Sequence, residues 1–99
     1  MCGAPAQAQS LPAGTDLTRE TVLVGTVLAD GHPVGGAFVR LLDGTGEFTA
    51  EVVSSASGHF RFFSAPGTWT LRVLSRAGNG VARVDAPGPG LHEVDVLVG

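Results

Sequence analysis

Short apolar runs, separated by breaks rich in glycine and proline, recur at roughly ten-residue intervals along this sequence. The breaks contain Asp-Gly, Gly-Gly and Pro-Gly pairs, in which glycine permits the positive φ that tight turns require. No stretch keeps apolar residues at helical spacing without an interrupting Gly or Pro. The sequence therefore predicts a seven-stranded antiparallel β-sandwich. The strand-like runs are 21–29, 37–43, 47–54, 59–64, 68–75, 81–86 and 91–98.

The first twenty residues differ from the rest of the chain. Residues 1–20 show neither helical nor alternating periodicity and are rich in small residues. We expect a flexible N-terminal arm over 1–20 and one β-sandwich domain over 21–99. The N-terminus has no basic segment followed by an apolar one, and no apolar run approaches the ~20 residues that span a bilayer. A cytoplasmic protein is the expectation.

Charged residues are few and evenly spread. The 99 residues include 6 Lys+Arg, all of them Arg, against 9 Asp+Glu, for a net charge of −3. Nucleic acids and anionic membranes are bound by clustered basic side chains, which neutralise phosphates. We therefore expect neither nucleic acid nor a membrane as a partner.

Alternation within the runs predicts which side chains face the core. Phe60, Phe62, Trp69 and Leu71 are predicted to form its centre, where each contributes roughly 1.5–3 kcal/mol by burial. Trp69→Ala is then the most damaging truncation, at roughly 3–5 kcal/mol of unfolding free energy. The other inward positions are Ala37, Val39, Leu41, Phe48, Ala50, Val52, Val73, Val94, Val96 and Val98.

Turn positions also predict strand pairing. Closing the turn at 64–67 by pairing Phe63 with Thr68 puts Phe62 opposite Trp69, and Phe60 opposite Leu71, in one hairpin. The same reasoning applied to the preceding turn places Glu51 opposite Arg61. Both hairpins are hypotheses drawn from the turn positions.

The outward parity also carries apolar residues. Leu42, Val53, Phe63 and Leu74 are predicted to face outward, joined by Leu28 if its strand follows the same parity. Such an area is a candidate interface for a protein partner or for self-association into a homo-oligomer. Alternatively, the first twenty residues fold back and cover it.

Four segments together resemble the carboxypeptidase regulatory-like domain: L-V-G-T-V at 23–27, D-G-H-P-V-G-G-A-F-V-R-L at 30–41, S-G-H-F-R-F at 57–62 and P-G-T-W-T-L-R-V at 66–73. The resemblance covers residues 21–75 and implies a transthyretin-like (prealbumin-like) β-sandwich. Trp69 stands where Tyr is more usual in that superfamily, and Ser57 where Asp is.

The whole chain resembles more specifically the actinobacterial domain-of-unknown-function family 1416. The resemblance rests on the opening M-C-G-A-P and on G-G-A-F-V-R-L-L-D followed by G-E-F-T-A-E-V-V. Members are often encoded beside thiosulfate sulfurtransferases, which implies a link to sulfur metabolism. The family supplies no catalytic residues.

Cys2 is the sharpest candidate for chemistry. As the single cysteine it excludes an internal disulfide. If Met1 is removed, Cys2 combines a free α-amine and a thiol, which titrate near ~8 and ~8.5. Such a residue could accept sulfur as a persulfide or bind a soft metal. The competing interpretation is an incidental cysteine in a flexible tail.

Neither a metal site nor an active site is expected. Three imidazoles can hold zinc, but an up-and-down strand order places His32 and His59 at one end of the sandwich and His92 at the other. Transthyretin-like folds include a hydroxyisourate hydrolase, whose family ends in Tyr-Arg-Gly-Ser. This chain has no tyrosine and ends at 95–99 in D-V-L-V-G. No cofactor is expected.

These inferences predict a non-enzymatic binding or accessory module of sulfur metabolism, with a thiosulfate sulfurtransferase as its partner. Two alternatives remain open. In one, Cys2 is a sulfur acceptor that carries a persulfide; in the other, the domain is a purely structural module.

Overall fold

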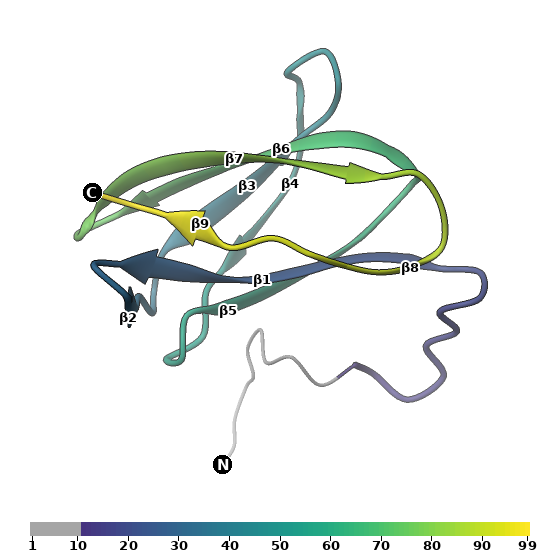
Figure 1. Ribbon diagram of the computed structural model, residues 1–99, viewed down its shortest axis with the longest axis horizontal. Helices are drawn as coiled ribbons and strands as arrows, with labels where there is room; N and C mark the ends of the chain where they lie inside the picture. The colour runs from purple at the N-terminus through teal and green to yellow at the C-terminus, as the bar shows by residue number, and fades with distance from the viewer. Residues whose placement is uncertain (1–10) are drawn as a thin grey trace.

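The computed structural model describes residues 11–99, which contain nine β-strands and no helix. The strands form two sheets that enclose one apolar core (Figure 1), so the expectation of a two-layered all-β domain is confirmed. No helix that could cross a membrane occurs within the described range. The strands are β1 (Thr21–Ala29), β2 (His32–Pro33), β3 (Phe38–Leu42), β4 (Phe48–Val53), β5 (His59–Ser64), β6 (Gly67–Ser75), β7 (Gly78–Ala86), β8 (Gly90–Glu93) and β9 (Val96–Leu97).

One sheet has the strand order β4-β3-β6-β7, and all its neighbours are antiparallel. The other sheet is built around β1, which pairs antiparallel with β2 and β5. On β1, strands β8 and β9 pair in parallel, so the sandwich is mostly but not wholly antiparallel. The expectation of purely antiparallel pairing was therefore wrong for the predicted strand 91–98.

The predicted strand 91–98 divides into β8 and β9 where the chain passes Gly25 of β1. The main chain of Val94 lies so close that a Cβ on Gly25 would be 1.7 Å from the Val94 carbonyl oxygen. Only glycine, which has no side chain, allows this approach. The amide of Val94 donates to the carbonyl of Val24 at 2.9 Å, so the strand stays attached to β1 across the interruption.

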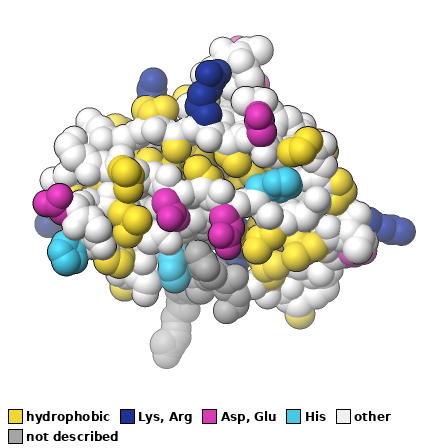
Figure 2. Space-filling model, viewed as in Figure 1, with side chains coloured by type: hydrophobic (Ala, Val, Ile, Leu, Met, Phe, Trp, Pro, Cys, Tyr) yellow, Lys and Arg dark blue, Asp and Glu magenta, His cyan; other side chains and the backbone are white. Residues whose placement is uncertain are grey.

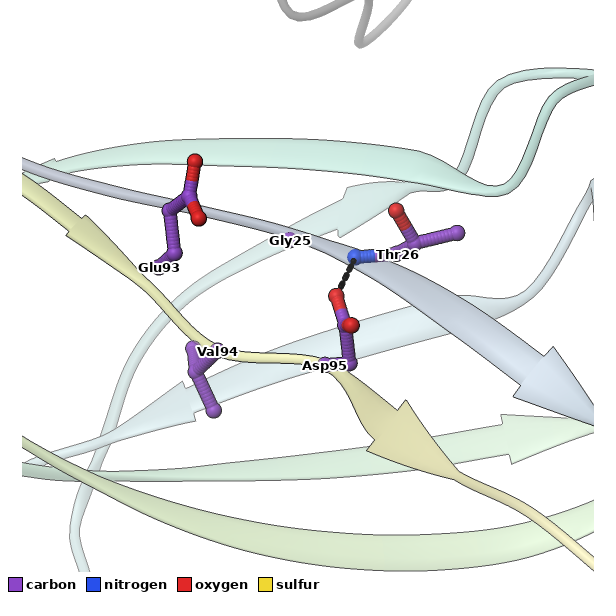
Figure 3. Close-up of a pocket in the computed structure, with 5 residues that line it drawn as sticks. All are labelled: Gly25, Thr26, Glu93, Val94 and Asp95. Atoms are coloured by element: carbon purple, nitrogen blue, oxygen red, sulfur yellow. Dashed lines mark hydrogen bonds between the residues drawn. The ribbon is translucent and has the colours of Figure 1, made fainter.

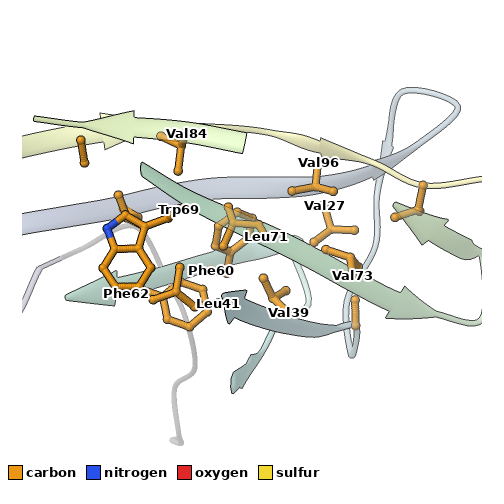
Figure 4. Packing of buried hydrophobic residues seen from close by; sticks show 14 residues of the cluster. Val27, Val39, Leu41, Phe60, Phe62, Trp69, Leu71, Val73, Val84 and Val96 are labelled. Carbon is orange, nitrogen blue, oxygen red and sulfur yellow. The ribbon is translucent and has the colours of Figure 1, made fainter. Parts of the chain in front are cut away.

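The core lies between the two sheets (Figure 4). Phe60, Phe62, Trp69 and Leu71 are all buried, which confirms their predicted place in the core. The indole Nε1–H of Trp69 donates to the carbonyl of Ala65 at 2.9 Å, so its polar atom is satisfied. The rest of the buried cluster is Leu23, Val27, Ala37, Val39, Leu41, Val73, Val84, Ala86, Val96 and Val98.

The predicted β5–β6 hairpin was wrong, although its residues are buried as expected. Strand β5 pairs with β1, and β6 pairs with β3 and β7, so the turn between them carries the chain from one sheet to the other. Phe62 and Trp69 therefore approach from opposite sheets (Figure 4), and they are not neighbours within one sheet. Likewise Glu51 lies opposite Arg40 of β3, and not opposite Arg61.

Phe48 was predicted to face inward, and it is instead 61% exposed. The register between β3 and β4 shifts so that Leu41 faces Ala50 whereas Leu42 faces Phe48. This bulge gives β4 one extra residue, Thr49. The β4 residue that precedes Thr49 therefore faces the opposite side of the sheet from the one that its position in the alternation predicts. Phe48 consequently joins Leu42 on the outward side.

The last strand joins the two sheets along one side of the molecule. Strand β9 lies between β1 and β7 in Figure 1. A Cβ on Gly80 of β7 would be 2.2 Å from the carbonyl oxygen of Leu97, and the amide of Val98 donates to the carbonyl of Leu28 at 2.9 Å. This side of the sandwich is therefore closed by main chain.

Residues 11–20 lead into β1 through two turns. The amide of Thr15 donates to Pro12, and the amide of Arg19 donates to Asp16, at 3.2 and 3.0 Å. The carbonyl of Glu20 accepts a hydrogen bond from the amide of Gly90, which ties the entry of β1 to the start of β8. Flexibility of the segment 1–20 stays a prediction, and residues 1–10 lie outside the described range.

Candidate functional site

The outward side of the sheet β4-β3-β6-β7, hereafter the outer face, carries an unusual number of exposed apolar side chains. Five of the large exposed apolar residues in the described range lie there. Extended apolar surface of this kind marks sites of protein association more often than ordinary solvated surface. Its apolar residues are Phe38, Leu42, Phe48, Val53, Leu74 and Val81.

Strand register brings these residues together. Phe38 of β3 lies directly opposite Val53 on one neighbouring strand and Leu74 on the other. These three side chains form a continuous apolar row across three strands, with Phe38 in its centre at 50% exposure. Val81 lies opposite Arg72 in the adjacent row and extends the apolar area to β7.

Arginines share the outer face with the apolar row. Arg40 donates from Nε to Oε2 of Glu51 at 2.7 Å, and its guanidinium carbon lies 5.8 Å from the ring centroid of Phe48. Within residues 11–99, neither Arg72 nor Arg83 forms a salt bridge. The face thus carries Arg40, Arg72 and Arg83 against Glu51 and Asp85, a net charge of 3 − 2 = +1 on a chain of net charge −3. Figure 2 shows basic side chains projecting from the upper surface, where this sheet lies.

Of the four residues predicted to form an interface, three share one surface. Leu42, Val53 and Leu74 do lie on the outer face, but Phe63 belongs to β5 in the other sheet and cannot share a surface with them. The error arose from the assumption that β5 continues the sheet of β6. Leu28 also lies in that other sheet, on β1.

Sequence reasoning missed three members of the outer face. Phe38 and Val81 have the same parity as Arg40 and Arg83 on their strands, so alternation alone could have identified them. Phe48 could not have been found in this way, because its outward orientation depends on the bulge between β3 and β4.

A hollow with a volume of ≈410 Å³ lies beside the β8–β9 interruption. Its lining includes Glu93 and Asp95, whose carboxylates are drawn in Figure 3. Oδ1 of Asp95 accepts a hydrogen bond from the amide of Thr26 at 3.0 Å. Because strand pairing is interrupted here, this carboxylate replaces the missing main-chain acceptor and stabilises the fold.

Ser54 is the most buried polar side chain of the turn region that follows β4. Its Oγ donates to the carbonyl of Val34 at 2.7 Å and accepts from the amide of Ala37 at 2.9 Å. The hydroxyl is therefore fully engaged with the main chain. This geometry suits a structural clamp between β4 and the loop before β3.

The three histidines are distributed along β1. His32 lies opposite Ala29, His59 opposite Thr26 and His92 opposite Leu23, with His92 and His59 on different neighbouring strands. His92 Nε2 lies 2.9 Å from the carbonyl oxygen of Gly88. Within residues 11–99, no group of three or more His, Cys, Asp or Glu side chains is arranged to hold a metal ion.

Cys2 lies outside the described residues, so its proposed chemistry has no geometry to support it.

The remaining hollow of note is a groove of ≈510 Å³ at the β5–β6 crossover, lined by Phe63, Pro66 and Trp69 among others. Its walls combine these apolar rings with polar side chains, which are Arg19, Glu20, Thr21, Thr49 and Ser64.

Comparison with known proteins places this chain in a family. Residues 2–98 match the family described as "Protein of unknown function (DUF1416)". The chain belongs to this family. Two uncharacterized proteins of Mycobacterium tuberculosis are each 63% identical to it over 99 residues, covering 99% of both chains. An uncharacterized protein of Mycolicibacterium smegmatis is 65% identical over 89 residues, covering 89% of this chain and 99% of that one.

Solved structures of other families share the fold of this DUF1416 chain. A DUF3823 family protein from Parabacteroides merdae matches with a TM-score of 0.64 and 18% identity, over 82% of this chain and 46% of that one. Catechol 1,2-dioxygenase from Pseudomonas arvilla C-1 matches with a TM-score of 0.61 and 12% identity, over 88% of this chain and 55% of that one. The chain thus spans about half of each solved protein, and the likeness concerns the fold alone.

Proposed function

We propose that this protein is a non-enzymatic binding module that docks onto a partner protein through its outer face. The observation that carries the proposal is the row of Val53, Phe38 and Leu74, which lies exposed across three neighbouring strands. Burying such side chains against a partner is favourable by roughly 25 cal/mol per Å² of apolar surface. A rigid sheet loses little conformational entropy when it docks, because its backbone is already ordered.

The size of the outer face suits a modest interface. Four strands at a spacing of ~4.8 Å and about five residues at ~3.4 Å per residue give a surface of roughly 19 by 17 Å. This flat area of roughly 320 Å² is less than half of the ~800 Å² that each partner buries in a standard specific interface, and it falls in the range of weak, transient complexes. A reversible accessory complex is the association that this size supports.

The partner that we propose is a thiosulfate sulfurtransferase, with the complex working in cytoplasmic sulfur metabolism. Its support is the family resemblance, because members of the family are often encoded beside such enzymes.

We also propose that the domain is transthyretin-like, in the broader group of carboxypeptidase regulatory-like domains. The two-sheet architecture and the four matching sequence segments support that placement, although the strand count of nine exceeds the expected seven.

Purified thiosulfate sulfurtransferase, immobilised on a biosensor, tests the proposal directly. We expect wild-type protein to bind and Phe38→Asp to bind at least tenfold more weakly, since a carboxylate would enter the apolar row. Phe63→Asp is the matched control: Phe63 is similarly exposed but lies on the other sheet, so binding should be unchanged. Thermal unfolding of each variant checks that the fold is intact. Equal binding by wild type and Phe38→Asp would overturn the role of the outer face.

The sulfur-acceptor alternative concerns Cys2, which lies within the family match that begins at residue 2. Incubation with the sulfurtransferase and thiosulfate, followed by intact mass measurement, separates it from simple docking. A gain of about 32 Da that disappears in Cys2→Ser would identify a persulfide carrier. Complex formation without any mass gain would support the docking module. A purely structural module would show neither.

A further inference from the structure

The outer face has an apolar part and a cationic part, and we propose that together they select a partner segment in which a large apolar side chain is flanked by carboxylates. This inference rests on the proposed function, in that it assumes the outer face to be a docking surface. It adds the chemical character of the partner segment that binds the outer face. The claim is that the outer face distinguishes acidic partners from neutral and basic ones.

The apolar part can hold an anchor residue. Val53, Phe38 and Leu74 lie on consecutive strands, so the row extends roughly 10 Å across the sheet. That width accommodates one aromatic or branched side chain with contacts on both sides. Residues of this kind contribute most of the binding energy in protein interfaces.

The cationic part begins with Arg72 beside the apolar row and extends to Arg83 one row further along the strands. Arg72 is on the same strand as Leu74 and the same side of the sheet, two residues or about 7 Å away. Arg83 lies on the neighbouring strand β7, where its cross-strand partner is Thr70. Both side chains are exposed. Each guanidinium offers a planar fork that can bind one carboxylate through two hydrogen bonds.

The arginines of the outer face are not equivalent, and this difference carries the inference. Arg40 is already engaged by Glu51 and lies over the Phe48 ring. Arg72 and Arg83 have no salt bridge within residues 11–99. Asp85 lies two residues from Arg83 on the same side of β7, and its carboxylate accepts a hydrogen bond from the Thr68 hydroxyl at 2.7 Å. A partner that covers them without supplying carboxylates would remove water from two charges and leave them uncompensated, which is costly. Acidic partners avoid that cost, and the two arginines therefore favour the binding of acidic segments over neutral or basic ones.

Other occupants fit the outer face less well. A second copy docked face to face would bring two surfaces of net charge +1 together, and like charges in a desolvated interface repel. A single-stranded nucleic acid requires aromatic rings free for base stacking within a basic groove. Of the two exposed aromatic rings on the outer face, Phe48 lies under Arg40 and Phe38 lies within the apolar row. The face also carries the carboxylates of Glu51 and Asp85, which repel phosphates.

Selection from a random twelve-residue peptide library displayed on phage tests the inference without assuming any particular partner. Wild-type protein is the bait, and peptides that also bind Phe38→Asp are discarded. We expect the retained peptides to combine an aromatic or aliphatic residue with Asp or Glu. Their affinity, measured by fluorescence polarisation, should fall at least tenfold in the double variant Arg72→Glu with Arg83→Glu. Arg19→Glu is the matched control, because Arg19 lies in the turn before β1, and it should leave the affinity unchanged.

Each other outcome overturns the inference in a distinguishable way. Retained peptides that lack carboxylates, or that bind the double variant as tightly as wild type, would refute the acidic preference and leave the docking face standing. If no peptide whose binding depends on Phe38 is retained, the acidic preference is also refuted. The biosensor experiment with the sulfurtransferase tests the docking role of the outer face separately. Salt-sensitive binding of a labelled single-stranded oligonucleotide, lost in the double variant, would replace the acidic partner by nucleic acid. A dimer in sedimentation, abolished by Phe38→Asp, would replace it by a second copy.

Discussion

The two faces of the sheet β4-β3-β6-β7 carry similar apolar residues with different consequences. On β6, Leu71 and Val73 point inward and are 0% exposed, whereas Leu74 points outward and is 39% exposed. The inner face is apolar throughout, while the outer face interleaves its apolar residues with arginines. Hydrophobicity alone therefore does not separate a core from an interface on this sheet. The charged neighbours do, because a fully buried face could not accommodate them.

A matched pair of truncations on one strand tests this comparison most strongly. Leu71→Ala should lower the free energy of unfolding by about 2–5 kcal/mol, because it opens a cavity in the core. Leu74→Ala removes the same atoms from the outer face and should cost less than about 1 kcal/mol. Chemical denaturation measures both. Similar losses for the two variants would mean that the outer face is part of a core.

Glycines extend the comparison from side chains to main chain. Gly25→Ala should destabilise the protein by about 1–3 kcal/mol or more, since the new Cβ would collide with the Val94 carbonyl and force β8 and β9 away from β1. Gly44→Ala is the control, because its Cβ would come no closer than 3.9 Å to the Thr68 carbonyl oxygen. Thermal unfolding of the two variants should differ clearly. An unchanged midpoint for Gly25→Ala would contradict the close strand crossing.

Buried hydrogen bonds give a smaller expected effect. Ser54→Ala should cost about 1–2 kcal/mol, because the amide of Ala37 and the carbonyl of Val34 both lose their partner. Ser57→Ala, at an exposed position in the following turn, should be close to neutral. Denaturant titration distinguishes them. Equal stability would mean that water replaces the Ser54 hydroxyl without loss.

The smallest expected effect concerns pH and the exposed β3–β4 loop. The hydroxyl of Thr45, followed by the amides of Glu47 and Thr45, donates to the carboxylate of Asp43 and lowers its pKa. A group whose pKa is lower in the folded state stabilises the fold above its unfolded pKa, and that stabilisation is lost as the pH falls through the folded pKa. Asp43→Asn should therefore melt slightly earlier than wild type at neutral pH, and the difference should shrink in acid.

The control for this pH series is Gly44→Ala in the same loop, which changes no titratable group. The difference between its melting temperature and that of wild type should change less with pH than the difference for Asp43→Asn. A difference between Asp43→Asn and wild type that grows on acidification would contradict the expected sign.

Alternation of residue types was sufficient to predict strands and much of the core. The runs of β3, β5 and β6 alternate cleanly, and Val39, Phe60 and Leu71 are buried as their parity requires. Parity is a local property, determined by the geometry of the strand itself. For this reason the prediction of which residues are buried survived even where the predicted strand partners were wrong.

Pairing could not be predicted in the same way because it is not local. A turn such as 64–67 can close a hairpin or carry the chain to the opposite sheet, and Phe62 and Trp69 are buried in both cases. The bulge that exposes Phe48 depends on the register of β4 against β3. The contact that requires Gly25 involves Val94, from the other end of the domain. The candidate site inherits this limit, since which apolar residues share the outer face follows from strand order.

The parallel attachment of β8 and β9 to β1 has a consequence for folding kinetics. Thr26 and the Asp95 carboxylate that caps it are 69 positions apart in sequence. During synthesis, β1 leaves the ribosome first and must wait for almost the whole domain before its last neighbours arrive. The chain must lose the conformational entropy of closing this long loop before the contacts between the distant strands can stabilise it. Topologies dominated by such distant pairings therefore fold slowly. Until then one edge of β1 is unpaired, and the nascent chain is open to association with other strands.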